Sequence, residues 1–176
     1  METPSGVLLY ISGIPSVFPD RIPTQDLLRQ VGNVCTYDPI TGKQTRKPLT
    51  AVLDPTGDET YQNIRPVSIT EFDVVVTGLI GIPVPDFANS ARPAIENYFL
   101  GREPYIRGLS DDNNKTNTIT KNNIHTIVDQ TVSAMKAVFK ECFVLFDGEP
   151  IPEGTYDLGT GELSKLRHLI VNGKKL

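Results

Sequence analysis

The chain has 176 residues, a mass of 19.4 kDa and a net charge of −4. This length allows one domain or two small ones, and it suffices for a core that needs neither a disulfide nor a metal to fold. The 14 prolines and 14 glycines imply many short elements and exclude a long helical bundle or a coiled coil.

The charge balance argues against nucleic acid as the main partner. The 17 basic residues are outnumbered by 21 acidic ones, so there is no overall excess of positive charge to neutralise phosphates. No apolar run approaches the roughly 20 residues that span a bilayer. Residues 7–11 are also too short for the core of a signal peptide. We therefore expect a cytoplasmic protein without a membrane partner.

The first part of the chain predicts a strand and a short helix. Residues 6–12 are β-branched and aromatic, as is typical of a strand. Thr24 is a suitable N-cap for a helix over residues 25–31, which Gly32 and Asn33 would end.

A long loop and a well-defined strand follow. Residues 33–64 are rich in turn signals and predict an extended excursion on the surface. Residues 65–77 alternate in polarity and predict a strand that turns Phe72, Val74 and Val76 toward the core. The charged residues of this strand are expected on its solvent side.

Two helices and three strands are expected in the remainder. One helix begins at Asp86, or at Asn89 and Ser90, and ends near Leu100, which places Pro93 in its first turn. Apolar residues at helical spacing predict a second helix. The second helix would run from residues 119–120 to 136, and the strands would occupy residues 139–146, 155–158 and 166–171.

This order of elements predicts an α+β fold, with two small lobes of short mixed sheets and packed helices. The polar stretch 107–118 is the expected boundary between the lobes. The N-terminal α+β lobe would span residues 1–108, including the long loop at 33–64, and the C-terminal α+β lobe would span residues 109–176.

No signature of catalysis, of a cofactor or of a metal site is present, so we predict no catalytic, cofactor-binding or metal-ligating residue. Cys35 and Cys142 are expected to be free, buried thiols, with a disulfide as the alternative. His125 is expected on the flank of a helix, whereas His168 lies in a predicted strand and has no predictable side.

Three segments together resemble a known family. They are RPVS at residues 65–68 before the valine-rich strand, YDLGTGELSKL at residues 156–166, and NG at residues 172–173. Their order and spacing resemble the baseplate J-like family, whose members are wedge components of contractile-tailed phages. The resemblance covers residues 6–31 and 64–173 and implies that the chain corresponds to the C-terminal region of such a protein.

The resemblance implies a structural role and no enzymatic activity. The chain would be a component of a contractile phage, prophage or phage-like tail baseplate and would form wedge and ring contacts. Its partners would be other baseplate and tail proteins and copies of itself. It would be assembled in the cytoplasm of the host bacterium and would lie in the baseplate of the virion tail.

One loop combines the residue types that dominate protein interfaces. Arg102, Tyr105, Ile106 and Arg107 follow a predicted helix, and we interpret them as an interface element. In the alternative interpretation, Tyr105 and Ile106 cover a sheet edge of their own lobe.

Two other functions stay open at this point. One is a generic protein-binding or adhesion module on an α+β scaffold. The other is a small hydrolase that uses Asp73 or His168.

Overall fold

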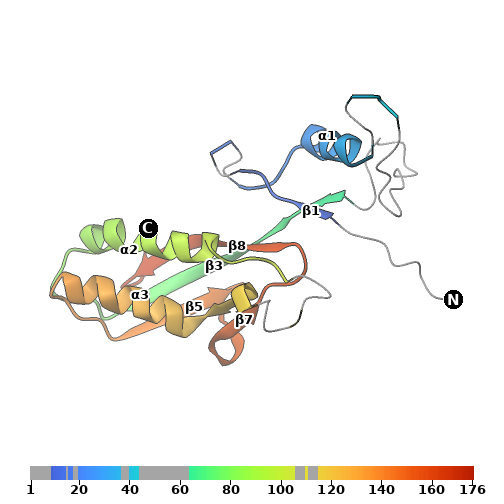
Figure 1. The fold of residues 1–176 in the computed structure, drawn as a ribbon. Coiled ribbons are helices and arrows are strands. Elements are labelled where there is room, and N and C mark those ends of the chain that lie inside the picture. Colours follow the sequence, from blue (N-terminus) through green and yellow to red (C-terminus); the bar gives the residue numbers. More distant parts are fainter. Residues whose placement is uncertain are drawn as a thin grey trace. The chain divides into compact units, whose positions relative to one another are not determined.

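A computed structural model describes residues 9–14, 16–17, 20–36, 40–43, 64–105, 110 and 115–176 (Figure 1). The predicted α+β class is confirmed, because helices and small mixed sheets make up the described parts of the chain. The chain divides into two compact units, residues 1–68 and 69–176. The lobe boundary expected between residues 108 and 109 lies inside the second unit, because strands from both sides of it pair in one sheet.

The first unit contains a small parallel sheet and one helix. Strand β1 (Leu9–Ile11) pairs in parallel with β2 (Ile64–Pro66), and α1 spans Gln25–Thr36. The Oγ1 atom of Thr24 accepts a hydrogen bond from the N–H of Leu27 at 3.3 Å, as expected for an N-cap. A small core forms from Leu28 and Ile64, with Leu9, Ile11 and Val31 partly buried against it.

Helix α1 continues past its expected end at Gly32 and Asn33 to Thr36. Gly32 is buried inside the helix, and tertiary packing there outweighs a helix-propensity cost of about 1 kcal/mol for glycine. Within the expected loop at residues 33–64, positions 37–39 and 44–63 lie outside the described residues.

The second unit contains a five-stranded sheet with the order β6-β5-β3-β8-β9. The strand expected at residues 65–77 is divided at Val67 into β2 and β3. Strands β3 and β5 are antiparallel, with Phe72 opposite Phe146 and Thr77 opposite Glu141. The strands are β3 (Ser68–Thr77), β5 (Glu141–Phe146), β6 (Glu149–Pro150), β8 (Glu162–Val171) and β9 (Lys174–Lys175).

Strand β8 begins four residues before its expected start at Leu166. It runs in the same direction as β3, because Asp73 contacts Arg167 and His168 and, further along both strands, the carbonyl of Val76 accepts a hydrogen bond from the N–H of Asn172 at 2.9 Å. The sheet is therefore mixed. A separate two-stranded sheet pairs β4 (Thr118–Thr120) with β7 (Thr155–Asp157).

Helices α2 (Val84–Leu100) and α3 (Lys121–Ala134) lie side by side on one face of the five-stranded sheet (Figure 1). The predicted core side of β3 is confirmed, because Phe72, Val74 and Val76 are fully buried in the cluster that joins the helices to the sheet. None of the described helices is long and apolar enough to cross a membrane.

Pro93 does not lie in the first turn of α2 as expected, but inside the helix. The helix begins earlier, at Val84 after Pro83, and Pro85 occupies the first turn, where a missing N–H is tolerated. Phe87, Ala88 and Ala91 are buried, and this packing holds the start of the helix on the sheet.

Helix α3 has the predicted start. The side chain of Thr120 accepts a hydrogen bond from the N–H of Asn123 at 3.3 Å, which caps the helix. Ile124, Val128 and Val132 form its buried stripe.

Candidate interaction surface

The face of the five-stranded sheet that points away from α2 and α3 carries apolar side chains. The register of β3 and β5 places Val75 opposite Phe143, and Asp73 opposite Leu145, on this helix-free face. Val75, Phe143, Leu145 and, on β8, Ile170 are half-buried, and none of them belongs to the helix-facing core. The buried residues of both described helices of the second unit, α2 and α3, pack on the opposite face of the sheet.

Strand β8 contains an irregularity that shapes this face. Leu166 and Leu169 both belong to the helix-facing core although they are three positions apart. Strict alternation would place them on opposite faces of the sheet. The strand therefore accommodates one additional residue between them, as in a β-bulge, and Arg167 and His168 both point to the helix-free face.

Arg167 and His168 converge on the carboxylate of Asp73. The guanidinium of Arg167 donates from Nε to Oδ1 and from Nη2 to Oδ2 of Asp73, both at 2.9 Å. The Nδ1 atom of His168 lies 2.9 Å from Oδ1 of the same carboxylate. Because an ionised carboxylate only accepts hydrogen bonds, Nδ1 carries a hydrogen in this contact. We call these three residues the Asp73 cluster.

The cluster compensates the burial of its carboxylate. Asp73 is only 7% exposed. The hydrogen bonds from Arg167 hold the pKa of Asp73 below its ordinary value, against the opposing effect of burial, and the contact with His168 adds to the lowering. Asp73 in turn raises the pKa of Arg167. A buried charge is tolerated only when it is paired in this way, so the cluster is a satisfied polar centre within an apolar face.

Asp73 was expected on the solvent side of its strand, and His168 had no predictable side. Asp73 does lie on the helix-free face, but it is buried and hydrogen-bonded, so it is not a solvated charge. The signal for the cluster was the spacing of Leu166 and Leu169, because two core residues three positions apart in a strand indicate an inserted residue.

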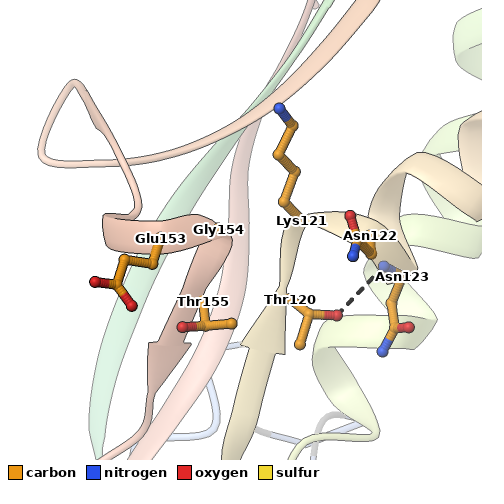
Figure 2. Close-up of a pocket in the computed structure, with 7 residues that line it drawn as sticks. All are labelled: Thr120, Lys121, Asn122, Asn123, Glu153, Gly154 and Thr155. Carbon is orange, nitrogen blue, oxygen red and sulfur yellow. Dashed lines mark hydrogen bonds between the residues drawn. The ribbon is translucent and has the colours of Figure 1, made fainter.

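A polar hollow of about 540 Å³ lies beside the start of α3 (Figure 2). Glu153 and Thr155 lie on one side of it, and Asn122 and Asn123 lie on the other. The ammonium of Lys121 stacks over the ring of Phe143 at 5.0 Å from its centroid and is therefore engaged within the chain. The residues that line the hollow are Thr120, Lys121, Asn122, Asn123, Glu153, Gly154 and Thr155.

The predicted interface loop is described only in part. The guanidinium of Arg102 lies over the ring of Tyr98 at 4.7 Å from its centroid, and Tyr105 is half-buried. Ile106 and Arg107 lie outside the described residues. The role of this loop as an interface element therefore stays a prediction.

The remaining titratable candidates lie apart from the Asp73 cluster. His125 is exposed on α3, beside the ring of Phe139. Both cysteines are free, but Cys35 is half-buried and only Cys142 is buried as expected. Burial raises the pKa of the Cys142 thiol to about 12. Across the described ranges, no group of three or more His, Cys, Asp or Glu side chains is suited to hold a metal ion.

A scan against protein-family models finds no match to this chain, and a search of the curated proteins finds none either.

Proposed function

We propose that this chain is a structural component of a contractile phage or phage-like tail baseplate, where it forms wedge and ring contacts through protein–protein interfaces. Its partners are other baseplate and tail proteins and copies of itself. It is assembled in the cytoplasm of the host bacterium and becomes part of the tail baseplate of the virion.

The observation that carries the proposal is the composition of the helix-free face of the sheet. When one face of a sheet is solvated, its outward side chains are ordinarily polar. Here Val75, Phe143, Leu145 and Ile170 are apolar, and the polar groups between them are paired in the Asp73 cluster. An apolar centre with a few satisfied polar groups is the composition of a protein interface.

The resemblance to the baseplate J-like family supports the same role. Residues 156–166 of the resemblance include two residues of β7 and the first half of β8, and residues 172–173 form the turn between β8 and β9. These segments build the five-stranded sheet and the small sheet beside it, so the resemblance concerns the scaffold that presents the helix-free face.

Deleting the gene for this chain in the phage or prophage that encodes it tests the proposal. We expect particles without an assembled baseplate in negative-stain electron microscopy, and normal particles after complementation with the wild-type gene. Normal baseplates in the deletion strain would overturn the proposal.

Complementation with Leu145→Lys tests the helix-free face itself. This variant introduces a charge opposite the carboxylate of Asp73, where a positive charge is tolerated, and is expected to yield folded protein but no baseplate. Thr126→Lys, on the exposed side of α3, is the matched control and should restore assembly. Full complementation by Leu145→Lys would show that another surface makes the contacts.

The contact between Asp73 and His168 favours a hydrolase as a second candidate, because a carboxylate orients the imidazole of a general base in the same way. In this chain, however, both oxygens of Asp73 also bind Arg167, so its charge is already compensated. Hydrolysis of p-nitrophenyl acetate distinguishes the two candidates. A saturable rate that His168→Ala abolishes would favour the hydrolase, and an equal rate for the variant would exclude it.

A further inference from the structure

The second unit has two ends that differ in charge. The register of β3 and β5 defines them, with Thr77 opposite Glu141 at one end and Phe72 opposite Phe146 at the other. The loops 78–83 and 135–140 and the turn at 172–173 gather at the first end. The turn at 147–148 and the sheet of β4 and β7 lie at the second, where the ring of Tyr156 is 5.1 Å from that of Phe72.

The first end presents two large aliphatic side chains on a fixed backbone. Ile80 and Val138 are 67% and 61% exposed, respectively. Each donates its N–H to the carbonyl of the other, at 2.9 and 3.0 Å. The two loops approach so closely that a Cβ at Gly78, which has a φ of +68°, would lie 2.6 Å from the Cβ of Lys140. The exposed pair is therefore held rigidly.

Lysines surround this pair. Residues 78–83, 135–140 and 172–175 together contain four lysines and neither aspartate nor glutamate, and the exposed carboxylates next to these segments are those of Asp86 and Glu141. Lys136, Val138 and Lys140 are exposed, and they alternate with Ala137 and Phe139, which pack inward. The side chains on either side of Val138 therefore carry positive charge. We call this surface the basic end.

The second end is acidic. Its described segments carry five carboxylates, and Leu100 at the end of α2 is 46% exposed. Two basic side chains at this end, those of Arg102 and Lys121, are engaged within the chain, because Arg102 stacks on Tyr98 and Lys121 on Phe143. We call this surface the acidic end. Its carboxylates belong to Glu103, Asp147, Glu149, Glu153 and Asp157.

We propose that the basic end of one copy docks on the acidic end of a second copy of this chain. The two ends match in both respects that an interface requires, because each combines exposed aliphatic surface with charges opposite to those of the other. A contact between two different surfaces of the same chain propagates from copy to copy, into a ring or a filament. This contact would be one of the ring contacts of the proposed function and rests on that function.

Sedimentation velocity of the purified full chain tests the contact. We expect association that grows with protein concentration at about 20 mM salt and weakens at about 0.5 M salt, where charge interactions between exposed groups are screened. A chain that stays monomeric at both salt concentrations overturns the inference.

Charge-reversal variants assign the contact to these ends. The first variant, Lys136→Glu with Lys140→Glu, replaces two of the four lysines of the basic end by carboxylates. The second variant, Glu149→Lys with Glu153→Lys, replaces two of the five carboxylates of the acidic end by lysines. Each alone should lose association by about tenfold or more in dissociation constant, because the replaced residues then face groups of the same charge. An equimolar mixture should regain association, because in the mixture they again face groups of opposite charge. Unchanged association of the variants, or a mixture that does not associate, contradicts the inference.

A matched control separates surface position from net charge. Asp129→Lys with Gln130→Lys lies on an exposed stretch of α3 away from both ends and raises the net charge by three, against four for the second variant. It should associate like the wild type, and circular dichroism should show that all variants are folded.

If the purified chain is monomeric while deletion of its gene abolishes the baseplate, the inference fails and the proposed function stands. If the mixture associates while deletion leaves baseplates intact, the proposed function fails instead.

Discussion

The side-chain amide of Asn172 pairs with both backbone groups of Leu79: it accepts a hydrogen bond from the N–H and donates one to the carbonyl, each at 3.0 Å. The contact joins the turn after β8 to the loop after β3, 93 positions apart in the chain. It thereby anchors the basic end, because Leu79 precedes the exposed Ile80.

Removing this amide should destabilise the second unit. Asn172 has a φ of +49°, so Asn172→Gly removes both hydrogen bonds without backbone strain, whereas Asn172→Ala adds strain. We expect the glycine variant to lose about 1–3 kcal/mol of unfolding free energy in urea titrations, and the alanine variant to lose about 1 kcal/mol more. A glycine variant as stable as the wild type would show that the amide contributes nothing.

The Asp73 cluster predicts a defined dependence of stability on pH. The pKa of Asp73 is lowered in the folded chain, so the cluster stabilises the fold above the unfolded pKa of about 4 and loses this effect as the pH falls through the folded pKa. Asp73→Asn should therefore cost about 1–2 kcal/mol at neutral pH and clearly less near pH 3. Urea unfolding of both proteins at the two pH values measures the difference, and an equal cost at both would rule out an ionised carboxylate.

Pro93 leaves one backbone carbonyl of α2 without its helical partner, since proline has no N–H. The position is exposed, and its backbone is helical, so alanine fits without repacking. Pro93→Ala should raise the unfolding free energy by about 1–3 kcal/mol, visible as a higher melting temperature. Ala94→Gly, in the same turn, is expected to act in the opposite direction. A lower melting temperature for Pro93→Ala would show that packing of the helix depends on the proline.

The two thiols should differ in reactivity. Burial raises the pKa of Cys142 to about 12, so almost no thiolate is present at pH 8. Ellman's reagent should leave Cys142 unmodified in the native Cys35→Ser variant and modify it in denaturant. In the Cys142→Ser variant, the half-buried Cys35 should react without denaturant. Rapid labelling of Cys142 in the native state would show that the space between α3 and β5 opens readily.

Local signals in the sequence predicted much of the fold. Thr24 and Thr120 cap helices as expected, and the polarity of β3 identified its buried face, because caps and alternation depend only on neighbouring residues. The early start of α2 at Val84 was not expected, because Pro83 and Pro85 are typical of a loop. Its buried first turns are held by tertiary packing, which local propensity does not report.

Features that depend on distant residues were beyond the sequence alone. The boundary at residues 108 and 109 was expected from a polar stretch, but β3 and β5 pair across it. The Asp73 cluster joins residues 94 and 95 positions apart, and no periodicity links them. Pairings of this kind are set by the topology of the sheet rather than by local pattern.

The additional residue in β8 makes the Asp73 cluster recognisable in an alignment of related sequences, because it changes the length of this strand by one position. A related chain without it would return to strict alternation, and then either Leu166 would leave the core or one of Arg167 and His168 would enter it. Chains that keep the Asp73 cluster must therefore also keep the length of this strand. A single-residue gap at this point in an alignment would separate chains that have the cluster from chains that have lost it.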